Sequence, residues 1–206
     1  DGMGGYNGGE IASRLAAETT KNYIQNNFEK IEHDKEAISK LIKDAMEYAN
    51  MVVYEESKKD ENLQGMGTTL DECFIYNSKI YIGHVGDSRI YLIKKDIARK
   101  ITKDHSYVQQ LVEDKKITRE EAEHHPKKNM LLKALGCTSY VEPDIRARNL
   151  EKDDILLMCS DGLTNMVEEN KIYEVVRENK EKAPEILVNL ANNAGGYDNI
   201  TVITII

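Results

Sequence analysis

The first third of the chain contains two stretches in which apolar residues recur at helical spacing. The first starts near residue 8, contains no proline, and has the apolar positions Ile11, Leu15, Ala16, Tyr23 and Phe28. The second starts near Asp34, and its apolar stripe is Ile38, Leu41, Ile42, Ala45, Ala49, Val52 and Val53. This stripe ends in the charged stretch 55–61. The spacing predicts two long amphipathic helices that lie side by side.

From Gly67 the pattern changes to the period of two that is typical of strands. Strand-like patterns rich in β-branched and aromatic residues occupy 68–76, 80–82 and 90–92, with a turn at Asn77-Ser78. We therefore predict an antiparallel meander over 67–92. Strand patterns return at Ile145, in the apolar run 155–159 and in the last eight residues, 199–206. The run 155–159 has the character of a strand buried on both faces.

Helical patterns also occur at 172–176 and 184–194, where Pro184 suits a first turn. Residues 104–140 are polar, with short helical patterns at 107–112 and 119–125, and we interpret them as an insertion. Strands and helices do not alternate regularly along the chain. This order favours an α+β fold, in which helices cover antiparallel sheets, over a doubly wound sheet.

Length and composition narrow the class of protein. A chain of 206 residues with 40% hydrophobic and 31% charged residues predicts one domain with one substantial core. No apolar run approaches the length of a membrane span, and no basic, apolar targeting segment opens the sequence, so we expect a cytoplasmic protein with no membrane partner. The cysteines, Cys73, Cys137 and Cys159, lie far apart and indicate neither disulfides nor a zinc site.

The net charge of −8 argues against a nucleic acid as partner, because binding one requires a clustered basic face. The charge is uneven, however. Residues 94–128 contain ten Lys or Arg against seven Asp or Glu. From charge alone, a solvated surface segment explains this stretch best.

Four aspartates stand beside or close after glycine at the junctions of apolar runs and turns: Asp1-Gly2, Gly86-Asp87, Asp161-Gly162, and Asp198 after Gly195-Gly196. Each pair alone is an ordinary turn, but together they suggest a divided metal site. Oxygen ligands without His or Cys nearby favour Mg²⁺ or Mn²⁺. Clustered carboxylates repel one another unless cations neutralise them, so two or more ions are expected, and hydrolysis of a phosphate ester is the chemical hypothesis.

Two other motifs fit less well than this metal site. Residues 1–5 resemble a phosphate-binding loop, but Asn7 stands where the Gly-x-Gly-x-x-Gly pattern needs glycine. Ser160 lacks the Gly-x-Ser-x-Gly context of a nucleophile.

Seven short motifs, in order along the whole chain, carry a resemblance to a known family. They are Asp1-Gly2-Met3-Gly4-Gly5, Gly67-Thr68-Thr69, Val85-Gly86-Asp87-Ser88-Arg89, Asp104-His105-Ser106, Ala134-Leu135-Gly136, Cys159-Ser160-Asp161-Gly162-Leu163, and the run 195–202 around Asp198-Asn199. Together they resemble the bacterial branch of the metal-dependent protein phosphatases, called PPM or PP2C.

This resemblance implies a β-sandwich of two antiparallel sheets flanked by paired helices, in four αββα layers. It also implies hydrolysis of phosphoserine and phosphothreonine in proteins by a metal-activated water at a binuclear Mg²⁺ or Mn²⁺ centre. By match to the family motifs, Asp1 would bridge two ions and the carbonyl of Gly2 would bind one of them. Asp161 and Asp198 would complete that site, and Asp87 with Asp161 would hold a third, weaker ion.

The resemblance assigns further roles around this centre. Thr68, Thr69 and Asn199 would support the metal ligands through hydrogen bonds. The insertion 104–140 matches the family's flap, with His105 and Ser106 at its root, and would influence the choice of substrate. A structural role is the favoured interpretation of His105. The implied partners are phosphorylated proteins, the substrates of a bacterial Ser/Thr kinase.

The chain also departs from the family pattern. Members have opening strands before the first motif, with an Arg for the substrate phosphate and an acidic pair that supports the metals. We therefore expect an N-terminally incomplete phosphatase domain over 1–206. Tyr6 stands where bacterial relatives usually have His, which leaves the proton donor unassigned. These departures keep two alternatives open: a non-catalytic phosphoprotein-binding or scaffold domain, and a regulatory module that metals only stabilise.

Overall fold

The computed structural model describes residues 1–95 and 97–206, and the side chains of residues 5–7 lie outside this description. The prediction that concerns Tyr6 therefore falls outside the described residues. None of the described helices combines the length and apolar character needed to cross a membrane. All three cysteines are free thiols.

The helices and strands follow one another along the chain in this order: β1 (Gly2–Met3), α1 (Gly5–Asn27), α2 (Lys35–Ser57), β2 (Gly67–Thr68), β3 (Leu70–Tyr76), β4 (Lys79–Val85), β5 (Arg89–Ile93), β6 (Ala98–Lys100), α3 (Tyr107–Glu113), α4 (Arg119–Glu123), β7 (Asp144–Asn149), β8 (Ile155–Cys159), α5 (Asp161–Thr164), α6 (Glu169–Asn179), α7 (Ala183–Asn193) and β9 (Val202–Ile205). Short 3₁₀ turns cover Phe28–Lys30, Glu61–Leu63 and Lys180–Lys182.

The chain divides into two compact units. The first contains residues 1–86 and 104–149, and the second contains residues 87–103 and 150–206. The first unit contains the two-stranded sheet β1-β2 and the three-stranded sheet β3-β4-β7, the second contains a four-stranded sheet, and each unit has its own helices. The chain therefore has the predicted α+β composition, with helices added to antiparallel sheets. The prediction of a single domain with a flap at 104–140 stays a prediction.

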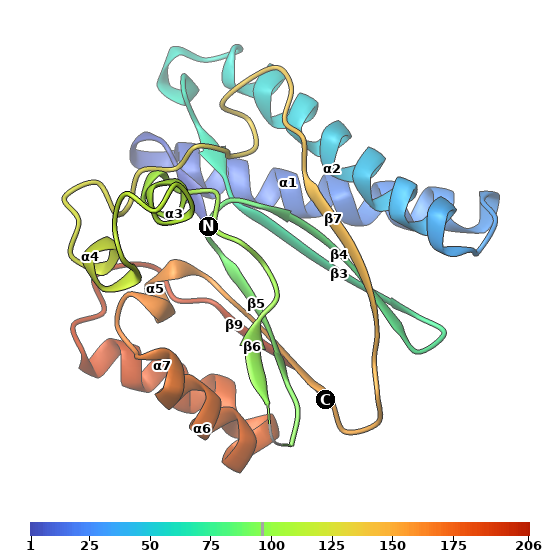
Figure 1. Ribbon diagram of the computed structural model, residues 1–206. Helices are drawn as coiled ribbons and strands as arrows, with labels where there is room; N and C mark the ends of the chain where they lie inside the picture. Colours follow the sequence, from blue (N-terminus) through green and yellow to red (C-terminus); the bar gives the residue numbers. More distant parts are fainter. Residues whose placement is uncertain (96) are drawn as a thin grey trace. The chain divides into compact units, whose positions relative to one another are not determined.

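In the first unit, helices α1 and α2 lie side by side along the sheet β3-β4-β7 (Figure 1). Helix α2 begins after Asp34, whose carboxylate accepts a hydrogen bond from the Ala37 amide at 2.8 Å. The stripe predicted from helical spacing is buried, apart from the half-buried Val52. Apolar side chains of both helices form one core with Tyr81 and Val85 of β4. The two-helix prediction is confirmed.

The predicted meander is only partly correct. Strands β3 and β4 form a hairpin through Asn77 and Ser78, which have φ values of 47° and 58°. The other neighbour of β4 is β7, whereas β5 joins the sheet of the second unit. Gly86, at φ +116°, ends the hairpin, and the chain leaves the first sheet there. Alternating polarity identifies strands, but it does not identify their partners.

The second unit contains the sheet β6-β5-β8-β9, with α6 and α7 packed together (Figure 1). Strand β8 is central in this sheet and pairs with β5 and β9. It is almost wholly buried, as its apolar run predicted. Apolar residues of β8, α6 and α7 share the core of this unit. Pro184 lies in the first turn of α7, again as predicted.

The 104–149 segment contains the two predicted short helices, α3 and α4. Helix α4 starts with a capping box, in which the side chain of Thr118 accepts from the Glu121 amide and the side chain of Glu121 accepts from the Thr118 amide. The C-cap of α4, His124, lies two residues before Pro126. These local signals explain why α4 begins and ends where it does.

Candidate functional site

Asp161 lies where the central strand of the second unit ends. Strand β8 stops at Cys159, and Asp161 is the first residue of the short helix α5. One carboxylate oxygen, Oδ2, accepts a hydrogen bond from the Asn165 side-chain amide at 3.0 Å. The other oxygen, Oδ1, is buried and has no hydrogen-bond partner among the described residues. A buried oxygen without a donor is costly for the fold, and a bound cation would satisfy it.

Asp198 is close enough to Asp161 for their charges to interact. Burial raises the pKa of the Asp161 carboxyl, and the neighbouring Asp198 raises it further. Asp198 itself is exposed, and its Oδ1 accepts a hydrogen bond from the Asn199 amide at 2.7 Å. The structure thus brings together two of the four aspartates that the sequence singled out. Their mutual repulsion is what a divalent cation between them would relieve.

Ser160 fixes the loop that carries Asp198. Its hydroxyl donates to the Asn199 carbonyl at 3.1 Å and accepts from the Thr201 amide at 3.0 Å. Its own amide donates to the Thr201 carbonyl at 3.1 Å. The side chain therefore has a structural role. The sequence did not reveal this role, although it carried a signal: a small hydroxyl residue directly before Asp-Gly at a strand end.

Gly162 is required by the same loop. A Cβ atom at this position would lie 2.4 Å from the Asn199 carbonyl oxygen, closer than any ordinary contact. Only glycine allows the Asn199 backbone to approach helix α5 this closely. Gly162 and Ser160 therefore both hold the Asp198 loop beside Asp161.

Asp1 is held by the two threonines that were expected to support the metal ligands. The Asp1 carbonyl accepts a hydrogen bond from the Thr68 hydroxyl and another from the Thr69 amide, both at 2.9 Å. The Asp1 nitrogen donates to the Thr69 hydroxyl at 3.1 Å. Both threonines are buried. The two threonines thus bind the backbone of Asp1, and their role in supporting metal ligands stays a prediction.

Gly2 follows Asp1 in the short strand β1, opposite Thr68 of β2. A Cβ atom on Gly2 would come within 1.9 Å of the Gly9 carbonyl oxygen in helix α1. Glycine is therefore needed at this position because two stretches of backbone are in close contact. Assignment of the Gly2 carbonyl as a metal ligand stays a prediction.

Asp87 is half-buried and directly follows Gly86, at the start of the second unit. The assigned flap residues lie in the first unit, close to Gly86 in the fold. The His105 amide donates to the Gly86 carbonyl at 2.8 Å, and the Gly86 amide donates to His105 Nδ1 at 3.1 Å. Ser106 caps helix α3 by accepting from the Gln109 amide at 3.3 Å. Both His105 and Ser106 are buried, which fits a structural role at the root of the segment.

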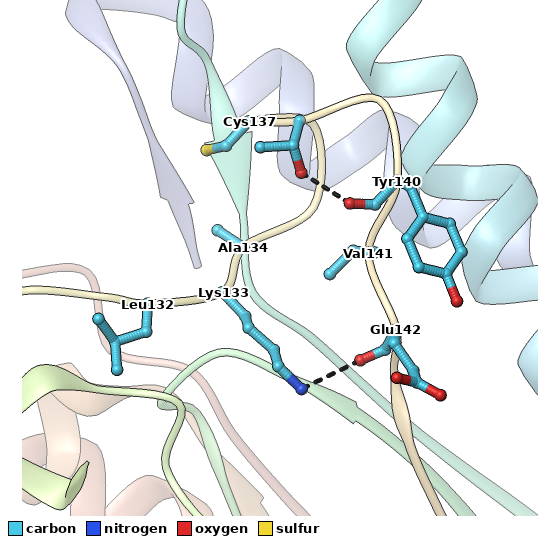
Figure 2. Close-up of a pocket in the computed structure, with 8 residues that line it drawn as sticks. Leu132, Lys133, Ala134, Cys137, Tyr140, Val141 and Glu142 are labelled. Atoms are coloured by element: carbon cyan, nitrogen blue, oxygen red, sulfur yellow. Dashed lines mark hydrogen bonds between the residues drawn. The ribbon is translucent and has the colours of Figure 1, made fainter.

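The 104–149 segment also lines a cavity of about 220 Å³ in the first unit (Figure 2). The Lys133 ammonium donates to the Glu142 carbonyl at 3.3 Å, and the Thr138 hydroxyl donates to the Tyr140 carbonyl at 2.7 Å. None of the residues assigned to the metal site lines this cavity. It therefore adds nothing to the aspartate site.

The assigned ligands are divided between the units. Asp1 and Gly2 belong to the first unit, and Asp87, Asp161 and Asp198 belong to the second. Among the described residues of either unit taken alone, no three His, Cys, Asp or Glu side chains are grouped as a metal site. The Asp161–Asp198 pair, with its unpartnered oxygen, is the part that fits a hard divalent cation.

Comparison with known proteins identifies the family. The model of the protein phosphatase 2C family matches residues 1–192. The serine/threonine phosphatase Stp of Listeria innocua is 39% identical over 210 residues, an alignment that covers 100% of this chain and 81% of Stp. The crystal structure of the serine/threonine phosphatase Stp1 from Staphylococcus aureus matches with a TM-score of 0.90 and 33% identity, over 99% of this chain and 80% of Stp1.

A third relative was solved with metal. The catalytic domain of the serine/threonine phosphatase PstP, in complex with two manganese ions, matches with a TM-score of 0.86 and 31% identity, over 99% of this chain and 84% of that domain. These matches confirm the fold class predicted from the sequence and the resemblance on which it was based. The chain belongs to the protein phosphatase 2C family.

Proposed function

We propose that this protein hydrolyses phosphoserine and phosphothreonine in other proteins, with divalent cations as cofactors. The observation that carries the proposal is the buried, unpartnered Oδ1 of Asp161 beside the carboxylate of Asp198. Two neighbouring carboxylates repel each other, and a divalent cation bound between them would relieve this repulsion. The relatives that are named serine/threonine phosphatases support the choice of substrate.

The proposed centre contains two ions. By match to the family motifs, we assign Asp1, the Gly2 carbonyl, Asp161 and Asp198 as its ligands, and Asp87 with Asp161 as ligands of a third, weaker ion. The structure of the relative PstP contains two manganese ions, which supports the proposal of two ions here. Mg²⁺ is the alternative metal for the same oxygen ligands. Such cations, when bound, polarise a phosphoryl group and make a water molecule nucleophilic.

The protein's own residues provide rigidity around this centre. Ser160 and Gly162 fix the loop of Asp198, and the two threonines fix the backbone of Asp1. A site that must keep ligand distances within about 0.2 Å depends on such support. The predicted partners, phosphoproteins made by a bacterial Ser/Thr kinase in the cytoplasm, belong to the same proposal.

The test compares Asp161→Asn with a matched control, Asp153→Asn. Asp153 is an exposed aspartate of the same unit at φ 70°, a conformation that asparagine tolerates well. Release of phosphate from p-nitrophenyl phosphate and from phosphothreonine peptides is measured with Mn²⁺, with Mg²⁺ and with a chelator. Chelator-sensitive turnover is expected in the wild type and the control, and a loss of more than about 100-fold in Asp161→Asn.

The same assays separate the alternatives. Retention of phosphopeptides without release of phosphate would support the non-catalytic binding domain instead. A large metal-dependent rise in melting temperature, with neither turnover nor phosphopeptide binding, would support the regulatory module. Turnover that persists in the chelator would refute the role of metal altogether.

A further inference from the structure

His105 connects two segments of the first unit that are distant in sequence. It has two hydrogen bonds with the same residue, Gly86: one from its amide to the Gly86 carbonyl, and one from the Gly86 amide to its ring Nδ1. Its carbonyl also accepts a hydrogen bond from the Leu132 amide at 2.8 Å. The His105 side chain is only 7% exposed, so water does not replace these bonds easily. His105 therefore joins the end of strand β4 to the root of the 104–149 segment.

The bond from the Gly86 amide determines the state of the imidazole. Because Nδ1 accepts the hydrogen bond from the Gly86 amide, it carries no proton of its own. The ring proton of the neutral form must therefore be on Nε2. That nitrogen faces Asp144 Oδ1, at 3.4 Å. The arrangement requires the neutral Nε2–H tautomer, because a proton on Nδ1 would abolish the bond to Gly86.

The surroundings of the ring favour this neutral form. Burial lowers the pKa of His105 to about 4, and the nearby His84 contributes to this shift, with their ring centroids 4.7 Å apart. Asp144 opposes the shift, but its carboxylate is also approached by Lys133 at 3.9 Å and Arg146 at 3.8 Å. The negative charge of Asp144 is thus shared with two cations, and little of it remains to stabilise a charged imidazole.

The backbone conformation of Gly86 is one that glycine allows but does not fix. Its φ of +116° lies in a region that residues with a side chain rarely adopt, and a Cβ atom would come within 2.5 Å of the Thr69 side chain. A glycine in the unfolded chain samples many conformations, so a specific restraint is needed to select one. The paired hydrogen bonds with His105 provide that restraint directly before Asp87.

We propose that His105 is a positioning residue for Asp87: its neutral imidazole binds the Gly86 amide at Nδ1 and so fixes the backbone that leads into the carboxylate. The inference rests on the proposed function, because it treats Asp87 as a metal ligand. It assigns to the root of the 104–149 segment a role in metal binding. No contact of His105 with the substrate is involved.

The test uses substitutions that differ in where they place an acceptor. His105→Asn keeps an oxygen at the δ position, whereas His105→Gln moves it one bond further out, and His105→Ala removes it. The control is His124→Ala, which changes an exposed histidine of the same segment. For each variant, Mn²⁺ binding is measured by calorimetry, and turnover of p-nitrophenyl phosphate is measured as a function of Mn²⁺ concentration.

We expect His105→Asn and His124→Ala to need about the same Mn²⁺ concentration as the wild type. His105→Gln and His105→Ala should need roughly tenfold more, because the buried Gly86 amide loses its acceptor. The KM for p-nitrophenyl phosphate should not change at saturating Mn²⁺. Equal Mn²⁺ requirements in the Asn and Gln variants would overturn the inference, since a merely structural role predicts no difference between the two acceptor positions.

Nitrogen NMR of the imidazole provides a readout that requires neither metal nor activity. Unprotonated and protonated ring nitrogens have different chemical shifts, and we expect His105 Nδ1 to be the unprotonated one at neutral pH. A proton on Nδ1 would refute the inference while leaving the proposed function intact. Conversely, a wild type that binds Mn²⁺ without turnover would refute the proposed function, and the calorimetric comparison would still test His105.

Discussion

The substitution Gly162→Ala tests whether the Asp198 loop must lie tightly against helix α5. The added methyl carbon would stand 2.4 Å from the Asn199 carbonyl oxygen, whereas ordinary contact begins at 3.4 Å, so the loop must move by about 1 Å. The three hydrogen bonds between Ser160 and this loop resist such a movement. Overpacking of this kind costs about 1–3 kcal/mol, a fall in melting temperature of roughly 2–12 °C for a chain of this size.

The functional effect should exceed the effect on stability. Asp198 directly precedes the displaced residue, and metal ligands tolerate shifts of only about 0.2 Å, so Mn²⁺ affinity should fall by at least about tenfold. Calorimetric titration with Mn²⁺ and thermal unfolding with and without the metal measure both effects. The control, Gly65→Ala, adds a methyl group at φ +76°, where no heavy atom lies within 4 Å, and should lose stability alone. A Gly162→Ala protein with wild-type Mn²⁺ affinity would refute the assignment of Asp198.

Three further substitutions or conditions test other parts of the structure. Asn50→Ala should lower the free energy of unfolding in urea by about 1–3 kcal/mol, because the buried Gly136 amide loses its acceptor at 2.8 Å; an unchanged denaturation midpoint would contradict this. Asp34→Ala should cost about 1 kcal/mol through loss of the cap of α2, and a loss of helicity in circular dichroism on heating should accompany it. His105 has a pKa of about 4 in the folded protein against an ordinary 6.5, so the unfolded chain takes up its proton first. Its contribution, at most about 3 kcal/mol, is therefore present above pH 6.5 and lost as the pH falls toward 4, and His105→Asn should flatten that slope in unfolding experiments on the metal-free protein.

The sequence predicted those parts of the fold that local signals determine. The long helices follow from apolar spacing, and the hairpin follows from Asn77-Ser78. The buried character of β8 follows from its continuous apolar run. Each of these features depends on a few adjacent residues or on a regular spacing of apolar residues, and both can be recognised in the sequence.

Features that depend on distant contacts could not be predicted in the same way. The second partner of strand β4 is β7, about sixty residues further along the chain, and no local pattern identifies it. Asn50 is another case, since it lies on the buried face of α2 but its side chain binds the Gly136 amide and the Thr138 carbonyl. The spacing of α2 alone would predict an apolar residue there. Such polar contacts become visible only when the fold has brought the two segments together.

The aspartates stood out in the sequence because each lies beside or close after glycine, and the structure gives three of these pairings a physical reason. Gly2 is in contact with the Gly9 backbone, Gly86 with Thr69, and Gly162 with the Asn199 backbone. In each case a side chain at this position would collide with the neighbouring segment, so glycine allows a second segment of the chain to pack directly beside the aspartate's backbone. A turn needs glycine only for its φ angle, whereas these positions also need its small volume. These Asp–Gly pairs therefore place carboxylates on backbone that cannot shift freely, which is a requirement of a metal site and not of an ordinary surface turn.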